Sequence, residues 1–156
     1  MSDPDKKVIC ANRRARFRYH LEETFEAGLA LTGSEVKSLR AGKAHLNDAY
    51  GRIKGGELYL MKAHIAPYEQ ANRENHEPER ERKLLLHRRE IDRISGKIRE
   101  RGFTLVPTKL YFKGGRAKVE VALARGKKLH DKRQAVADRE TKRELDRVMK
   151  RRRQGR

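Results

Sequence analysis

Residues 103–123 read FTLVPTKLYFKGGRAKVEVAL, and this stretch predicts a long β-hairpin. Phe103–Phe112 forms the first strand and Lys118–Leu123 the second, whose apolar residues alternate so that one face can be buried. Gly114-Gly115 separates the strands, and paired glycines readily adopt the positive φ angles of a tight hairpin turn. The stretch therefore places antiparallel β-structure in the second half of the chain.

A second hairpin and a long strand precede this stretch. Ala49–Lys54 and Leu58–Ile65 are strand-like and flank Gly55-Gly56, which predicts another tight turn. Phe17–Leu31 alternates apolar and polar residues as a half-buried strand does. Gly28 lies inside that strand and predicts a bulge or bend, as closed sheets need at their corners.

Two helices and one loop complete the pattern. Thr32-Gly-Ser-Glu35 fits a capping box, which predicts a short helix over Gly33–Ala41. A second helix is predicted for Lys83–Arg101, where a leucine and three isoleucines are spaced in whole turns. Pro67–Glu79, ahead of this helix, is expected to be a long loop, and such loops in compact domains are often functional.

These elements predict a mainly β domain with flanking helices over residues 1–126, closed into an oligonucleotide-binding-type β-barrel. Its opening segment, Met1–Arg16, is polar and basic and is expected to form a short mobile arm. Residues 127–156 hold too few apolar side chains for a core, so we assign them to a separate basic C-terminal tail.

The charge of the chain restricts the classes of molecule that it is expected to bind. Lys and Arg total 40 against 22 Asp and Glu, which gives a net charge of +18 and a pI near 10.4. Binding a polyanion relieves such self-repulsion, and the usual polyanion is nucleic acid. A membrane is disfavoured, because no apolar run approaches the roughly 18 residues of a spanning helix. Met1–Cys10 contains no signal-peptide core, so a cytoplasmic location is expected.

The tail is predicted to be disordered when free and helical on RNA. It holds 13 Lys or Arg and 5 Asp or Glu, a net charge of +8. Asp138 and Asp146 each precede a lysine by four residues, and one such pair stabilises a helix by only about 0.2–0.5 kcal/mol. That contribution is too small to hold an isolated helix of this length.

Catalytic signatures do not emerge from the sequence. It has no Walker-type loop, no nucleophile signature and no metal-binding histidine spacing, so neither a metal nor a cofactor is expected. A basic ribonuclease could in principle pair His76 with His87 or His130 as acid and base. Surface or turn histidines are far commoner, and we expect a protein that is not an enzyme.

Several polar residues are candidates for RNA contact on charge alone. Asn12–Arg16 has no apolar partner, and its guanidinium groups match phosphate oxygens. The segment 75–83 could place arginines on phosphates and His76 against a splayed base, or it could form only a turn and a helix N-cap. Glu35 could accept hydrogen bonds from a guanine edge or serve only as the capping acid, and both alternatives stay open.

Short motifs along nearly the whole chain resemble one family. They are NRRA at 12–15, FEAGL at 25–29, LTGSEVKSLR at 31–40, NHEP at 75–78, RKLLLH at 82–87, LVP at 105–107, GKK at 126–128 and DKR at 131–133. With these motifs in this order, the chain resembles the transfer-messenger RNA-binding proteins (SsrA-binding protein, small protein B) of bacterial trans-translation.

The resemblance implies an oligonucleotide-binding-type barrel that holds the tRNA-like domain of transfer-messenger RNA. It favours a functional role for Glu35. Carried onto this sequence, it implies RNA contacts at Asn12, Arg13, Arg14, Glu35, Lys37, Arg40, Asn72, His76, Arg80, Arg82 and Lys83. In the ribosome the tail would be helical and would occupy the decoding centre and the empty mRNA channel. The tail candidates are Lys127, Lys128, His130, Asp131, Lys132, Arg133, Val148, Met149 and Lys150.

The resemblance also implies a pathway and a set of partners. The protein would deliver transfer-messenger RNA to stalled ribosomes, where the nascent peptide is tagged for degradation. It would meet elongation factor Tu only indirectly, through the charged RNA, and would act as a monomer without a membrane. The alternative outside this family is a small basic ribosomal protein that is bound permanently to ribosomal RNA.

Overall fold

The computed structural model describes residues 6–100, 102–126 and 129–154, and the side chains of these except 72–74, 129–138 and 152–154. The strands are β1 (Lys6–Ala11), β2 (Tyr19–Leu29), β3 (Ala44–His45), β4 (Tyr50–Lys54), β5 (Glu57–Met61), β6 (His64–Ile65), β7 (Arg82–Leu85), β8 (Phe103–Lys113) and β9 (Arg116–Gly126). The helices are α1 (Arg13–Arg18), α2 (Gly33–Arg40), the 3-10 helix η1 (Glu69–Glu74), α3 (Arg88–Arg99) and α4 (Leu129–Gln154).

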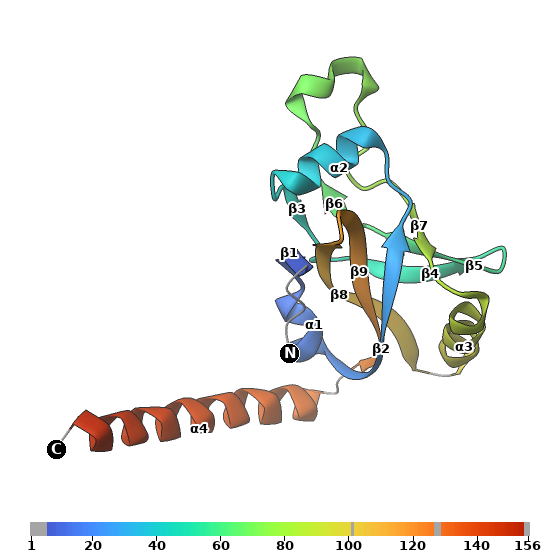
Figure 1. The fold of residues 1–156 in the computed structure, drawn as a ribbon. Coiled ribbons are helices and arrows are strands. Elements are labelled where there is room, and N and C mark those ends of the chain that lie inside the picture. Colours follow the sequence, from blue (N-terminus) through green and yellow to red (C-terminus); the bar gives the residue numbers. More distant parts are fainter. Residues whose placement is uncertain (1–5, 101, 127–128, 155–156) are drawn as a thin grey trace.

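The main sheet closes on itself in the order β8-β4-β5-β7-β2-β9, because β8 pairs with both β4 and β9 (Figure 1). β2 and β8 pair with β9 along most of their lengths, whereas β4 meets β8 at Gly51 and Leu105. Neighbouring strands of the ring are therefore paired over unequal lengths. The predicted mainly β fold with a closed strand ring and flanking helices is confirmed.

Both predicted hairpin turns are present, but the strand predicted over Leu58–Ile65 was wrong beyond Met61, because Lys62 has a φ of +57° and His64–Ile65 forms β6, which pairs with β3 in a second sheet. The φ angles are +57° and +76° at Gly55 and Gly56, and +57° and +77° at Gly114 and Gly115. Residues with a Cβ rarely adopt these left-handed angles, which is why glycine occupies both turns.

One apolar core joins the ring to two helices. Leu60, Leu105 and Val121 from the strands pack in the same buried cluster as Leu39 of α2 and Ile94 of α3. In Figure 1, α2 lies above the ring and α3 lies beside it. This packing fixes the positions of both helices relative to β7, whose Leu84 belongs to the same cluster.

The prediction of a mobile N-terminal arm was wrong within the described residues. Lys6–Ala11 forms β1 along β8, and Arg13–Arg18 forms α1, so β2 begins at Tyr19 rather than at Phe17. The apolar side chains of Ile9 and Cys10 pack against the main core, which holds β1 in place. Residues 1–5 lie outside the described residues.

The predicted helix over Lys83–Arg101 was wrong in its first turn. Arg82–Leu85 forms β7 between β5 and β2, and α3 begins at Arg88. Burial alternates along β7, with Arg82 and Leu84 inside and Lys83 and Leu85 outside. The need to close the ring overrides the local preference for helix.

The bulge predicted at Gly28 lies elsewhere on β2. The register shift falls between Leu21 and Glu23. Gly28 instead lets β7 approach closely, because a Cβ at this position would lie 3.2 Å from the Cβ of Leu85.

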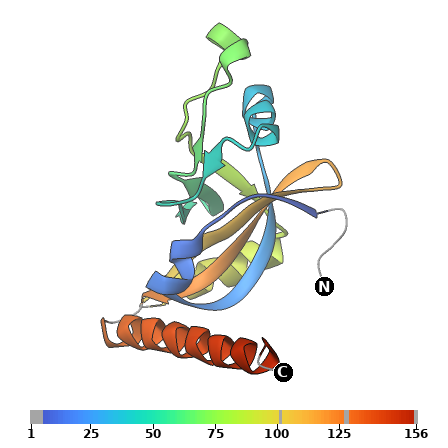
Figure 2. The ribbon, with the colours of Figure 1, turned by 90° about the vertical axis from the view of Figure 1, so that its left-hand side faces the viewer.

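α4 extends away from the ring and lies near α1, as both views show (Figures 1 and 2). The guanidinium of Arg139 lies 5.5 Å from the centre of the Phe17 ring. Leu145, Val148 and Met149 on α4 are exposed. The C-terminal helix is confirmed, while the disorder of the free tail stays a prediction. Among the described residues, no helix is long and apolar enough to cross a membrane.

Ring closure at β4–β8 predicts opposite effects for two glycine substitutions. In Gly51→Ala, the new Cβ would lie 2.8 Å from the Cβ of Leu105, so we expect a loss of about 1–3 kcal/mol in the free energy of unfolding. Gly96→Ala is the matched control, because a Cβ there meets nothing within 4 Å and alanine favours α3 by about 1 kcal/mol. Urea unfolding measures both, and equal effects of the two variants would contradict the close approach.

Candidate nucleic-acid interface

A buried carboxylate links α2 to β7 and to the loop before it. Glu35 and Arg82 are both fully buried, and the Arg82 Nε donates to the Glu35 Oε2. The Arg80 Nη2 donates to the Glu35 Oε1 at 2.7 Å, and the backbone amide of Thr32 donates to the same oxygen at 2.8 Å. The capping box predicted from Thr32 and Glu35 is confirmed. Glu35 therefore caps its helix and binds two arginines at once.

Arg82 uses its remaining donors to hold two further segments. Its Nη1 donates to the carbonyl oxygen of Ala63 at 2.7 Å, and its Nη2 donates to that of Pro78 at 3.1 Å. The guanidinium thus connects α2, the end of β5 and the loop 66–81.

The ionisation of this cluster follows from its contacts. Burial alone would raise the pKa of Glu35, but hydrogen bonds from Arg80, Thr32 and Arg82 outweigh it and lower the pKa to about 2. Burial lowers the pKa of the Arg82 guanidinium, and Glu35 opposes this effect. Arginine remains charged in proteins, so Glu35 and Arg82 form a buried ion pair at the N-terminal end of α2.

His76 is held by two hydrogen bonds in the same region. Its Nε2 lies 2.9 Å from the carbonyl oxygen of Ile65, and its Nδ1 lies 2.9 Å from the hydroxyl of Ser34. A carbonyl only accepts, so the Nε2 carries the proton and donates. Both ring nitrogens are occupied, which disfavours acid–base chemistry in this arrangement.

Asn75 joins the two ends of the loop around η1. Its side chain accepts from the Tyr68 amide at 3.0 Å and donates to the Tyr68 carbonyl at 2.8 Å. The ammonium of Lys37 lies 5.7 Å from the centre of the Tyr68 ring. Lys37 and Arg40 are exposed on α2, and Arg80 is partly exposed. The buried cluster therefore presents cations at the surface beside this loop.

Of the other residues that the sequence predicted to contact RNA, some are buried and others are exposed. Asn12 is buried, and its side chain donates to the carbonyl oxygen of Pro107 at 3.0 Å, while Arg13 and Arg14 are exposed on α1. Lys83 is exposed on β7. The side chain of Asn72 lies outside the described residues. In the structure, Asn12, Glu35 and Arg82 are buried and hold other segments, and the half-buried His76 is held by two hydrogen bonds.

The tail candidates are only partly described. Lys127 and Lys128 lie outside the described residues, as do the side chains of His130, Asp131, Lys132 and Arg133, whose backbone begins α4. Val148, Met149 and Lys150 are exposed on α4.

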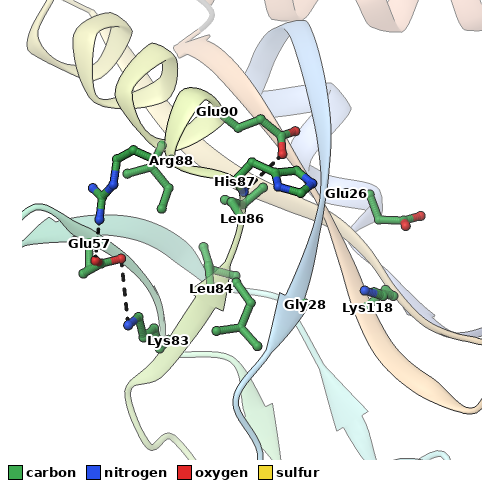
Figure 3. A pocket seen from close by; sticks show the side chains of 12 residues that line it. Glu26, Gly28, Glu57, Lys83, Leu84, Leu86, His87, Arg88, Glu90 and Lys118 are labelled. Atoms are coloured by element: carbon green, nitrogen blue, oxygen red, sulfur yellow. Dashed lines mark hydrogen bonds and ion pairs between the residues drawn. The ribbon is translucent and has the colours of Figure 1, made fainter.

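A cavity of about 730 Å³ lies between the end of β7 and the start of α3, and the sequence did not predict it. Leu85 lines it and is 51% exposed. Figure 3 shows Lys83, Arg88 and Glu57 on one side and Glu26 with Lys118 on the other. We call it the Leu85 cavity; it is lined by Glu26, Gly28, Glu57, Lys83, Leu84, Leu85, Leu86, His87, Arg88, Glu90, Ile91 and Lys118.

The carboxylates of the Leu85 cavity are held by cations and a phenol. Glu57 lies 2.8 Å from the Arg88 Nη2 and 3.9 Å from the Lys83 Nζ. The Tyr111 hydroxyl donates to Glu26 at 2.6 Å, which lowers the pKa of that carboxyl. Hydrogen bonds or ion pairs therefore hold both carboxylates in place.

The Leu85 cavity suits an unstacked nucleotide. Its leucines offer an apolar wall for a base, its carboxylates can accept from base amino groups, and its lysines and arginine can contact phosphates. From sequence alone, the apolar run Leu84-Leu85-Leu86 is expected only to pack in the core. Strand alternation across β7 is the signal that would have placed Leu85 outside. Among the described residues, no group of three His, Cys, Asp or Glu could hold a metal ion.

Known proteins resemble this chain along most of its length. The SmpB protein family matches residues 9–151. An SsrA-binding protein of Pelotomaculum thermopropionicum is 59% identical over 94% of this chain and 95% of its own length. Another, from Desulforudis audaxviator, is 58% identical over 95% of this chain and 97% of its own length. A solved chain from "tmRNA-SmpB: a journey to the center of the bacterial ribosome" is 52% identical, with a TM-score of 0.67, and the match covers 81% of this chain and 93% of that one.

A strongly basic strand ring with an open cavity and a protruding basic helix defines a nucleic-acid-binding protein. The matches are more specific, and this chain belongs to the SmpB protein family. The resemblance inferred from its motifs is confirmed.

The Glu35 cluster predicts a pH dependence of stability. Because folding lowers the pKa of Glu35 from 4.5 to about 2, its contribution is present above about pH 5 and is lost as the pH falls toward 2. Glu35→Gln leaves Arg82 buried without a counter-charge, so we expect it to cost about 3–5 kcal/mol at pH 7.

Urea unfolding between pH 7 and pH 2 measures this effect. The difference between the wild type and Glu35→Gln should shrink as the pH falls. Glu77→Gln is the control, because Glu77 is an exposed carboxylate. A difference that is constant across the pH range would contradict the assigned role.

Proposed function

We propose that this protein binds the tRNA-like domain of transfer-messenger RNA and delivers it to stalled ribosomes for trans-translation. The observation that carries the proposal is the open Leu85 cavity, with its exposed leucine among cations and carboxylates, in a strongly basic chain whose relatives are SsrA-binding proteins. Its SmpB relative in a solved structure is described together with tmRNA and the bacterial ribosome.

The proposal divides the candidate residues into two roles. The exposed or partly exposed cations contact RNA phosphates: Arg13, Arg14, Lys37, Arg40, Arg80 and Lys83. The buried Asn12, Glu35 and Arg82 and the half-buried His76 act as positioning residues that hold the interface in shape. Asn72 lies in η1 and is also proposed to contact the RNA. The Leu85 cavity adds a place for one unstacked base.

The tail has a separate role in this proposal. Residues 1–126 bind the transfer-messenger RNA, and residues 127–156 enter the ribosome. The first part of the tail meets the decoding centre through Lys127, Lys128, His130, Asp131, Lys132 and Arg133. The helix then follows the empty mRNA channel, and Val148-Met149-Lys150 supplies a later contact. A slender basic helix that extends away from the ring fits a channel with RNA walls (Figure 1).

The remaining features concern partners and location. The protein acts in the cytoplasm as a monomeric adaptor, has no catalytic step of its own, and meets elongation factor Tu only through the charged RNA. The described cluster around His76 supports a structural use of that histidine rather than a ribonuclease couple.

A binding titration tests the proposed RNA. At near-physiological salt, the protein should bind the tRNA-like domain of transfer-messenger RNA more tightly than an elongator tRNA or an unrelated hairpin. Leu85→Ala should weaken that binding about fivefold, because roughly 1 kcal/mol of apolar contact is lost. Leu145→Ala is the matched control, since Leu145 is 60% exposed on α4. Equal affinity for all three RNAs would favour a ribosomal protein that binds through charge alone.

Deletion of Lys132–Arg156 tests the role of the tail. The truncated protein should keep its affinity for the tRNA-like domain within about twofold, because the ring and its cavity do not include these residues. It should fail to support peptide tagging on stalled ribosomes in a reconstituted translation reaction. Tagging at the full-length rate would refute the assigned role.

A further inference from the structure

Two further cavities continue from the Leu85 cavity along the same surface. One, of about 470 Å³, shares Gly28, Leu85 and Lys118 with it. The next, of about 420 Å³, shares Phe112 and Gly115 with that one. We call these two cavities together the hairpin groove. It begins at β7, passes the β8–β9 turn and ends between β1 and α2.

The floor of the hairpin groove is apolar. Phe112, Leu31 and Val36 line it and are partly buried, and Val8 on β1 is 54% exposed beside it. Figure 2 shows β1 alongside the β8–β9 hairpin, and β1 pairs antiparallel with β8, with a register shift between Val8 and Cys10. A partly exposed aromatic ring in such a floor is a platform on which a base can stack.

The rim of the hairpin groove is cationic. Lys7, Arg40 and Arg116 are exposed at its edges, and Lys118 stands where it meets the Leu85 cavity. The lining of the groove includes no carboxylate, whereas Glu26, Glu57 and Glu90 line the Leu85 cavity. The groove therefore favours a phosphate-bearing strand and offers no side chain acceptor that could select a base.

The turn of the hairpin keeps the groove continuous. Gly115 lines both of its cavities and has a φ of +77°, an angle at which a residue with a side chain would be strained. The junction between the two cavities is consequently free of a side chain from the turn.

We propose that the hairpin groove holds the RNA strand that continues from the nucleotide in the Leu85 cavity. Phe112 stacks on an unpaired base of that strand, and Lys7, Arg40 and Arg116 contact its phosphates. This inference rests on the proposed function and extends the RNA surface from Arg40, which a sequence motif marked, to Lys7, Phe112 and Arg116, which no motif marked. Recognition in the groove depends on backbone charge and on an unpaired base, not on base identity.

Charge variants and a ring variant test the groove separately. Arg116→Gln and Lys7→Gln should each lower affinity for the tRNA-like domain about fivefold. Each should also flatten the plot of log affinity against log salt by about 0.7–0.9, the value for one phosphate contact. Phe112→Leu keeps an apolar side chain and should lower affinity about tenfold without changing the slope. Arg52→Gln is the control, because Arg52 is exposed on β4 and lines neither cavity of the groove.

The outcomes separate this inference from the proposed function. If Leu85→Ala weakens binding but Arg116→Gln and Lys7→Gln behave like Arg52→Gln at every salt concentration, the groove is not an RNA site and the proposed function stands. If the wild type shows no preference for the tRNA-like domain, both fail. Urea unfolding of Phe112→Leu shows whether its loss of affinity comes from unfolding, and the charge variants decide the proposal if it does.

Discussion

The RNA surface depends on the buried ion pair between Glu35 and Arg82. β7, which carries Arg82, pairs with its neighbours at few positions: Tyr59–Lys83 and Leu60–Arg82 on one side, Gly28–Leu85 and Leu29–Leu84 on the other. A slip of one residue would turn Leu85 inward and Arg82 outward. Such a slip would leave Glu35 buried without its partner, at a cost of several kcal/mol. The ion pair therefore fixes the register that places Leu85 in its cavity.

The same cluster also brings positive charge to the surface. One carboxylate meets two arginines, so the group keeps a net positive charge. Arg82 is fully buried, and the excess charge reaches solvent at Arg80, beside the exposed cations of α2. A buried carboxylate in a chain with a net charge of +18 thus serves the binding of anions by holding a cation in place.

The sequence predicted the features that a few adjacent residues decide. The capping box at Thr32 and the glycine turns of both hairpins depend on local chemistry, and all are present. The strand β7 was taken for helix because a short apolar run such as Leu84-Leu85-Leu86 fits either structure until the ring requires a strand. The burial of Glu35 and the two hydrogen bonds of the half-buried His76 could not be read from sequence, since polar residues near turns are usually exposed.

The Leu85 cavity was beyond sequence analysis for a different reason. It exists only where β2, β7, β9 and α3 meet, and Gly28 matters because of its distance from Leu85, not because of its neighbours in the chain. A leucine looks like core in any sequence, and only the positions of Lys118 and Arg88 around it show that it faces charged groups at a surface.

Charge also keeps the two parts of the protein available for different partners. The tail carries +8 of the total +18, which leaves +10 on residues 1–126. Both parts repel each other over roughly 8 Å at physiological salt. α4 contacts α1, where Arg139 lies over Phe17. Because like charge opposes folding of α4 back over the ring, the Leu85 cavity and the hairpin groove stay open. An RNA bound there would neutralise the ring while the tail keeps its own charge for a second RNA.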